Sequence, residues 1–484
     1  MIFGTIKPKN ALAVKYVARG VEFMGPRPEL VMFCPGQDPF FVLNFLYHHH
    51  RVPPGNRPLT NSDIAWKFGQ GTPALGHADV DFIITESNSK RMPDISMEIY
   101  PEIKSGALML KNPSTHLLKV ANGSSEGGDL VLGQGETVHL WKESTTVRLF
   151  TRSPRTYLEF EIKLWCSSKE HYVMERDDFF RRIRPNYHPM PGLNPLPSPT
   201  HQEVSDIIVH GLPVREASGN HVYSAIHKMT GEPLVIKRLE ILEGDDVGRR
   251  IDSIRNEVQM SRATRNGFTA YIDNIWYSHG VSVEPQLAPA TCFLVMGKAD
   301  SNMRYFLATK REIGIGYRLQ LLNAVLITMY ELHQVGVFHR NISLKSVLIL
   351  CKRDLNDELM YHPILGDFSR ATKLEKDTEE NLGPAHTVAP EVGRGEYACA
   401  PVDIWDFTVL CISVLEGCVP EGNNDVGAVG ILKPLDRLNA LYASSVIGLD
   451  LYNILRKGIA ENPEERISAR EMWQSDVWSA RNAG

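Results

Sequence analysis

Six prolines crowd one stretch of this 484-residue chain and constrain its folding more than any other feature. They lie within RPNYHPMPGLNPLPSPT, at Pro185, Pro189, Pro191, Pro195, Pro197 and Pro199. Proline fixes φ and lacks a backbone donor, so the stretch suits neither a helix nor an interior strand. It indicates an extended, semi-rigid linker, or alternatively a proline-rich ligand for another domain. We expect two domains, at 1–175 and 204–484, with a linker at 176–203.

The composition argues against several classes of protein. A net charge of −5 gives no support to nucleic-acid or membrane partners. The chain has no run of eighteen apolar residues and no secretory signal at its start, so we expect a cytoplasmic or nuclear protein. The seven cysteines are scattered without a C-x-x-C motif, which argues against a disulfide framework or a zinc site.

The first domain is expected to be rich in β-structure. Short alternating runs recur about every ten residues between turn signals, a rhythm typical of a sandwich or barrel. The pattern does not decide whether residues 1–80 belong to this fold or form a separate extension. The predicted strands lie in DVDFIITE, ISMEIYPEI, GALMLK, HLLKVA, GDLVLG, ETVHLW, TTVRLF and YLEFEIKLW.

One segment of the first domain carries a family pattern. The stretch SGALMLKNPSTHLLKV resembles a motif of the forkhead-associated (FHA) domain, a β-sandwich that binds phosphothreonine, and the resemblance extends over about 60–170. That family reads phosphate through positioned arginines, and MPDISMEIYP contains none of them. A generic interaction module is therefore an equal alternative. The matching residues are Leu110, Asn112, Ser114 and Val120.

The second domain switches from strand to helix periodicity. Residues 249–264 and 322–332 place apolar side chains at helical spacing, which predicts two amphipathic helices. Residues 403–416 are apolar nearly all round, which predicts a buried central helix. Strands first and helices afterwards indicate two lobes of different character.

Short motifs run through the second domain in a fixed order. Each triplet alone is weak, but the order and spacing together resemble the protein-kinase fold. The fold class we expect is thus a β-sandwich followed by a two-lobed kinase-like domain, with lobes at 204–297 and 298–484. The landmarks are VIK at 235–237, Glu257, HRN at 339–341, DFS at 367–369, APE at 389–391, DIW at 403–405 and Arg466.

The resemblance implies a site for ATP with Mg²⁺. In kinases the lysine at the position of Lys237 contacts the α- and β-phosphates and pairs with a glutamate, here Glu257. Asp367 occupies the position that holds Mg²⁺. The other positions that correspond to nucleotide contacts are Val222, Val235, Gly219, Met296 and Leu348.

The catalytic loop departs from the family pattern H-R-D-x-x-x-x-N at chemically important positions. Asn341 replaces the general-base aspartate, and an amide does not accept the proton of a substrate hydroxyl as a carboxylate does. Ser343 replaces a lysine, and Ser346 replaces the asparagine that holds a second metal. Loss of general-base assistance costs on the order of 10²- to 10⁴-fold in rate.

Residues that support the fold are kept. The resemblance implies a buried ion pair between Glu391 and Arg466, and implies that Asp403 caps the backbone of the catalytic loop. Altered catalytic residues in a preserved kinase-like fold are typical of a pseudokinase. We expect a regulatory or scaffold protein whose partners are other proteins, among them kinases or phosphoproteins. Two alternatives stay open: a weak or atypical Ser/Thr kinase, and an interaction module that binds no nucleotide.

Overall fold

The computed structural model separates into two compact units. The first comprises residues 1–216 and 221–236, and the second comprises residues 217–220 and 237–484. The residues that the structure describes are 2–24, 30–32, 34, 36–45, 60–71, 80–86, 92–121, 129–153, 155–165, 169–183, 193, 196–217, 220–241, 247–263, 271–278, 281–282, 291–353, 359–373, 388–394, 399–417 and 433–479.

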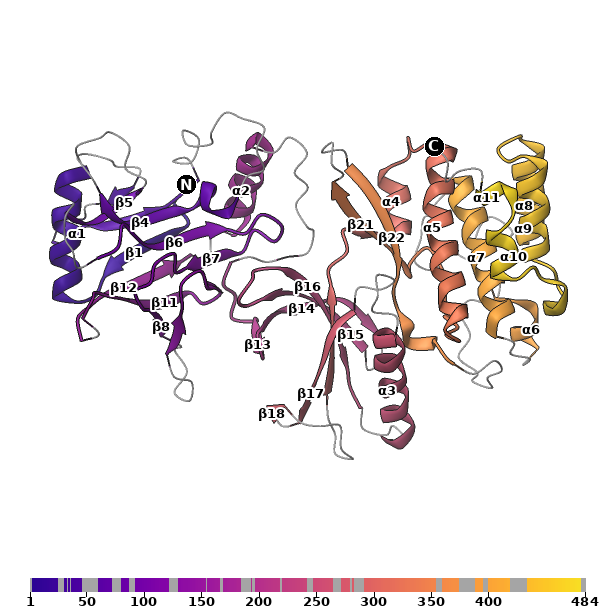
Figure 1. Ribbon diagram of the computed structural model, residues 1–484, viewed down its shortest axis with the longest axis horizontal. Helices are drawn as coiled ribbons and strands as arrows, with labels where there is room; N and C mark the ends of the chain where they lie inside the picture. Colours follow the sequence, from indigo (N-terminus) through magenta and orange to yellow (C-terminus); the bar gives the residue numbers. More distant parts are fainter. Residues whose placement is uncertain are drawn as a thin grey trace. The chain divides into compact units, whose positions relative to one another are not determined.

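A seven-stranded antiparallel sheet forms one layer of the first unit (Figure 1). Its order is β2-β3-β1-β12-β11-β8-β9, so the first strand lies inside the sheet, with Gly4 opposite Leu164. The strands are β1 (Gly4–Pro8), β2 (Val31–Met32), β3 (Phe40–Leu43), β8 (Leu118–Ala121), β9 (Leu130–Leu132), β11 (Ser144–Phe150) and β12 (Tyr157–Leu164).

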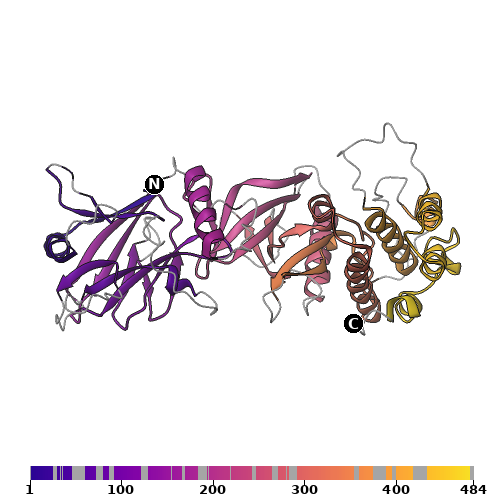
Figure 2. The ribbon, with the colours of Figure 1, turned by 90° about the horizontal axis from the view of Figure 1, so that it is seen from above.

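A five-stranded sheet in the order β10-β7-β6-β4-β5 forms the second layer. Aromatic side chains of the two sheets meet between them: the ring of Phe41 lies 6.0 Å from Phe68 and 4.8 Å from Phe82. The first unit therefore contains a β-sandwich (Figures 1 and 2). The strands of the second sheet are β4 (Trp66–Gly71), β5 (Phe82–Glu86), β6 (Ile95–Pro101), β7 (Leu108–Lys111) and β10 (Thr137–His139).

The N-terminal residues are part of this sandwich. Helix α1 (Ala11–Met24) places Val17 in its hydrophobic core, and β1 supplies Ile6 to the same core. A short 3-10 helix, η2 (Asn61–Ile64), leads into β4. The question that the sequence left open for residues 1–80 is therefore answered for the described part of that range.

The eight predicted strand segments all coincide with strands, β5 to β12, which confirms the β-rich first domain. The expected linker begins too early, however. Residues 176–183 are the second half of helix α2 (Lys169–Ile183), whose Phe179 and Phe180 are buried in the sandwich core. Apolar side chains that the core can bury favour the helix up to the first proline.

A second seven-stranded sheet has the order β13-β14-β15-β16-β19-β17-β18, and the boundary between the units runs through it. Helix α3 (Val247–Ala263) follows β16, and it is the amphipathic helix predicted at 249–264. The strands are β13 (Gln202–Val204), β14 (Ile207–Ala217), β15 (Asn220–His227), β16 (Pro233–Leu239), β17 (Tyr271–Ser278), β18 (Val281–Ser282) and β19 (Thr291–Gly297).

The rest of the second unit is mainly helical and contains the other two predicted helices. Its three-stranded sheet has the order β20-β21-β22. The elements are β20 (Ser301–Asn302), α4 (Met303–Thr309), α5 (Ile315–Gln334), β21 (Val347–Arg353), β22 (Leu359–Leu365), η5 (Phe368–Arg370), α6 (Pro390–Gly393), α7 (Cys399–Glu416), α8 (Pro434–Ala443), α9 (Leu449–Gly458), η6 (Pro463–Glu465), α10 (Ala469–Trp473) and α11 (Asp476–Ser479).

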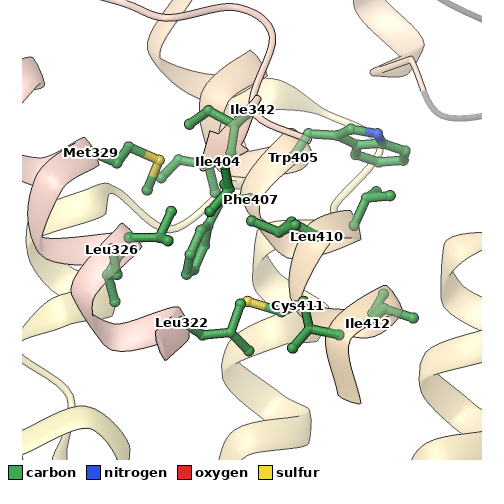
Figure 3. Packing of buried hydrophobic residues seen from close by; sticks show 14 of the residues in the cluster. Leu322, Leu326, Met329, Ile342, Ile404, Trp405, Phe407, Leu410, Cys411 and Ile412 are labelled. Carbon is green, nitrogen blue, oxygen red and sulfur yellow. The ribbon is translucent and has the colours of Figure 1, made fainter. Parts of the chain in front are cut away.

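The core of this unit forms between α5 and α7, as Figure 3 shows. Leu326 and Met329 of α5 and Phe407 and Cys411 of α7 are almost completely buried. Ile342 reaches the same core from the catalytic loop, so this core anchors the loop directly. Nearly all of α7 is buried, as the sequence predicted.

A buried ion pair ties α6 to the segment after α9. Arg466 Nη2 donates to Glu391 Oε2 at 2.6 Å, and both side chains are almost completely buried. Arg466 Nη1 also donates to the carbonyl of Pro401 at 3.0 Å. The expected pair is confirmed. No helix among the described residues is long and apolar enough to cross a membrane.

Candidate functional site

A lysine–glutamate pair joins β16 to α3. Lys237 lies near the end of β16, and its Nζ is 2.6 Å from Oε1 of Glu257 in the middle of the helix. The side chains are only 11% and 7% exposed. Burial alone would lower the pKa of Lys237, but the carboxylates of Glu257 and Asp367 outweigh it and raise that pKa. The lysine is therefore held in its charged form.

Asp367 is the second acidic neighbour of this lysine. Its Oδ1 lies 3.4 Å from Lys237 Nζ and accepts the hydroxyl of Ser369 at 2.8 Å. The backbone is left-handed here, with φ 62°, which turns the residue out of strand geometry directly after β22. Burial would raise the pKa of Asp367, but Lys237, Ser369 and His339 lower it, so a carboxylate is favoured.

Asn341 faces the other oxygen of this carboxylate. Its Nδ2 donates to Asp367 Oδ2 at 3.3 Å. An aspartate in that place would bring a second negative charge against the first, whereas the amide supplies a donor. The residue that replaces the catalytic base thus stabilises the neighbouring carboxylate.

The two serines of the catalytic loop bond within the loop itself. Ser346 Oγ donates to the carbonyl of Asn341 at 2.6 Å and accepts the backbone N–H of Ser343 at 2.8 Å. Ser346 is 3% exposed, so its hydroxyl is directed into the loop. These two side chains are used to close the turn between Asn341 and β21.

Asp403 of α7 holds the start of the loop, as expected from the sequence. Its carboxylate accepts the backbone N–H groups of His339 at 2.9 Å and Arg340 at 2.6 Å. Arg340 has φ +60°, a strained value for a side chain of this kind. Buried His339 in turn bonds the carbonyl of Gly366 at 3.0 Å, which connects the loop to Asp367.

Sequence reasoning missed Asp406, one turn further along α7. It accepts a backbone hydrogen bond from Ile342 and lies in the field of Arg370 and Asp403. Burial, with Asp403 adding to it, raises the pKa of Asp406 well above its usual range. The signal in the sequence was a second aspartate three residues after the first, within an otherwise apolar helix. Two aspartate side chains of one helix therefore hold the catalytic loop.

The remaining predicted residues fall into separate parts of the structure. Val222 on β15 and Val235 on β16 are half-buried and belong to the first unit. Met296 on β19 and Leu348 on β21 are half-buried in the second unit. Hydrogen bonds connect Lys237, Glu257, Asp367 and Asn341, while Gly219 lies outside the described residues.

The FHA-like motif residues of the sandwich serve their own loop. Asn112 is fully buried, and its Nδ2 donates to the carbonyls of His116 at 2.9 Å and Leu132 at 2.8 Å. Its Oδ1 accepts the backbone N–H of Ser114 at 3.0 Å. These bonds fasten the β7–β8 connection to β9. Arg91, the arginine directly before the MPDISMEIYP stretch, lies outside the described residues.

Curated relatives of the second domain are kinases. The probable serine/threonine-protein kinase KIN1 homolog of Encephalitozoon cuniculi is 28% identical over 210 residues, 41% of this chain and 33% of the relative. The mitosis inducer protein kinase cdr1 of Schizosaccharomyces pombe is 25% identical over 252 residues, 51% of this chain and 38% of the relative. The matched part thus spans about a third of these relatives.

A solved structure resembles more of the chain. The crystal structure of Rad53 1-466 in complex with AMP-PNP has a TM-score of 0.49 and 17% identity, and covers 93% of this chain and 99% of its own. The family model of the protein kinase domain matches residues 217–478, which is more than half of the chain. The order of motifs, the Lys237–Glu257 pair and this match agree: the chain belongs to the protein kinase family.

Proposed function

We propose that this protein is a regulatory or scaffold protein whose kinase-like domain binds nucleotide as a ligand and transfers phosphate poorly or not at all. The observation that carries the proposal is the hydrogen bond from Asn341 Nδ2 to Asp367 Oδ2. The amide nitrogen that donates to the metal-position carboxylate does not take a proton from a substrate hydroxyl, because its lone pair is delocalised into the carbonyl group.

The side chains around Lys237 fit the phosphates of ATP. A charged, almost buried lysine held by Glu257 is the arrangement that kinases use for the α- and β-phosphates. ATP, when bound, would supply the phosphate charge that Lys237 neutralises. Lys237 also contacts Asp367. Lys237 can therefore bind the phosphates of ATP, with the carboxylates of Glu257 and Asp367 beside it.

The donor set does not fit the pair of Mg²⁺ ions that kinases employ. Asp367 stands at the first metal position, and both its oxygens already accept hydrogen bonds, from Ser369 and Asn341. Ser346, at the second metal position, is buried and bonded to the loop backbone. Mg²⁺ requires near-octahedral oxygen ligands. With Asp367 and Ser346 engaged in this way, we expect nucleotide binding to depend only weakly on Mg²⁺.

Binding and catalysis are separated by two measurements. Thermal unfolding is followed with ATP at millimolar concentration, in EDTA and in Mg²⁺, and we expect an upward shift in both. Lys237→Ala, which removes the phosphate contact, should abolish the shift. If ATP does not shift the unfolding temperature of the wild-type protein, nucleotide binding is overturned. The function that remains is an interaction module that binds no nucleotide.

Autophosphorylation is measured with radiolabelled ATP for the wild-type protein and Asp367→Ala. Equal background in the two proteins is the expected outcome. The competing function is a weak Ser/Thr kinase, which the intact Lys237–Glu257 pair and the names of the relatives favour. Phosphoryl transfer depends chiefly on positioning and electrostatics, so incorporation that Asp367→Ala removes would establish this alternative.

The sandwich supports a role in binding other proteins. The loops at the ends of a β-sandwich commonly carry interaction sites. The FHA-like motif suggests phosphoproteins as partners. An array of phosphothreonine peptides, with unphosphorylated copies as the control, tests this class of partner. Binding that requires the phosphate would support phosphoprotein partners, and equal binding of both forms would favour a generic module.

A further inference from the structure

The end of β15 and the turn that follows it, residues 226–232 and here called the turn, are bonded to the sandwich within the first unit. His139 donates its backbone N–H to the carbonyl of Lys228 at 2.7 Å, and Thr137 Oγ1 donates to the carbonyl of Met229. Both donors belong to β10, the edge strand of the five-stranded sheet. An edge strand has backbone N–H and C=O groups that its own sheet leaves unpaired. Here carbonyl groups of the turn accept hydrogen bonds from this strand.

Apolar side chains seal the same contact. Ile226 is completely buried in a cluster with Tyr100, Ala107 and Met109 of the sandwich. Met229 packs against the main sandwich core. Removing apolar side chains from water in this way stabilises the folded chain. The turn is therefore held by packing as well as by backbone hydrogen bonds.

Gly231 permits the closest approach. Its φ of +75° is a left-handed value that glycine adopts without strain. A Cβ built at this position would lie 2.7 Å from Met109 Sδ and 3.1 Å from Glu102 Cγ. Any other residue would both strain the turn and press against Met109 of β7 and Glu102, which follows β6.

The chain that leads into the kinase region is packed as well. Leu196, within the proline-rich segment, is fully buried in the sandwich core. The rings of His201 and His210 stack at 4.7 Å. A Cβ on Gly211 would lie 2.2 Å from Thr200 Cβ. Leu196 thus attaches the connection to the sandwich, and Thr200 and His201 pack against β14.

We propose that the sandwich positions the strand that carries Lys237, so that nucleotide binding depends on the contact between sandwich and turn. β16 begins at Pro233, two residues after Gly231, and continues through Lys237. A hydrogen-bonded strand transmits a displacement along its length. The nucleotide part of this proposal rests on the function proposed above, whereas the ordering of β16 by the sandwich does not.

Gly231→Ala in the full-length chain tests the proposal, with Gly36→Ala as the matched control. Gly36 has the same φ of +75°, but a Cβ there meets nothing within 4 Å. Both variants introduce the same backbone strain, and only Gly231→Ala presses on the contact. Binding of a fluorescent ATP analogue should weaken roughly 3- to 10-fold for Gly231→Ala, since fewer molecules hold the competent strand.

Hydrogen exchange of residues 233–239 gives a readout that needs no nucleotide. We expect roughly tenfold faster exchange in Gly231→Ala and unchanged exchange in Gly36→Ala. Thr137→Val, which removes the hydroxyl that bonds Met229 and Tyr100 at nearly constant volume, should shift exchange in the same direction by less. Unchanged exchange in Gly231→Ala and Thr137→Val would overturn the proposal, even if the wild-type protein binds ATP. Faster exchange with no nucleotide binding in the wild type would keep the positioning role and refute the nucleotide site.

Discussion

Asn341 illustrates how far single positions can be interpreted from a sequence. The sequence shows that the base is missing, and the physical consequence for proton transfer follows from the chemistry of an amide. It does not show that this amide becomes a donor to Asp367, because the contact joins residues 26 positions apart. Asp406 was missed for a similar reason: an aspartate in an apolar helix gives no sign of the backbone group it accepts.

Asn341→Asp should destabilise the protein in the absence of divalent cations. The change removes a hydrogen bond to Asp367 and places two carboxylates at contact distance. We expect a loss of about 1–3 kcal/mol in EDTA, measured by urea unfolding. Asn341→Ala, which removes the bond without adding charge, should cost less. Mg²⁺ should restore stability to the aspartate variant alone, and equal behaviour of the two variants would contradict the prediction.

Asp406→Asn should change how stability depends on pH. The pKa of Asp406 is raised well above its usual 3.8 in the folded protein. Its protonated form is therefore favoured by folding, and that contribution is present below pH 3.8 and is lost as the pH rises through the raised value. The asparagine does not titrate, so its stability relative to wild type should increase from pH 4 upwards.

Urea unfolding at several pH values between 4 and 8 measures this difference. Asp450→Asn removes an exposed carboxylate at the start of α9, away from the catalytic loop, and serves as the control. Parallel pH curves for wild type and Asp406→Asn would show that the carboxylate of Asp406 does not titrate differently on folding.

Among the elements, local periodicity predicted most of what forms. Alternating runs became β5 to β12, and the helical runs became α3, α5 and α7. Helix α2 was assigned in part to the linker because the proline cluster was extended backwards over residues 176–183. Proline restricts only its own neighbourhood. The helix is stable because the sandwich covers Phe179 and Phe180, which a local pattern does not reveal.

Glu391→Ala should weaken the attachment of α6 to the segment after α9. The variant leaves the guanidinium of Arg466 buried without its carboxylate. We expect a loss of about 3–5 kcal/mol in the free energy of unfolding, measured by chemical denaturation. The double variant Glu391→Ala with Arg466→Met leaves no buried charge and should recover part of the loss. A double variant that is less stable than the single variant would contradict this explanation.

For the whole molecule, the sequence predicted the order of domains but not the packing of residues 226–232 on the sandwich. Ile226 and Met229 looked like ordinary strand and turn residues of the kinase region. Tyr100 and Met109, which pack with Ile226, lie more than a hundred residues earlier. Contacts over such separations leave no periodic signal in the sequence. Only the folded chain reveals that the sandwich covers residues 226–232.

A fragment comprising residues 204–484 should be less stable than the same region in the full chain. It would expose Ile226 and Met229, which the sandwich covers. Loss of about two buried side chains predicts a melting temperature roughly 5–10 °C lower, measured by scanning calorimetry on both proteins. An equal melting temperature for the kinase transition would show that the hairpin does not need this cover.

The place of β1 inside its sheet also affects when this sheet can fold during synthesis. Gly4 pairs with Leu164, so β1 and β12 can join only after the 160 residues from one to the other have been translated. At about 5–20 residues per second, β1 waits roughly 10–30 s before the sheet can close around it. Until then β1 has only β3 beside it, with Gly4 opposite Leu43, and the side of β1 that β12 later covers stays open.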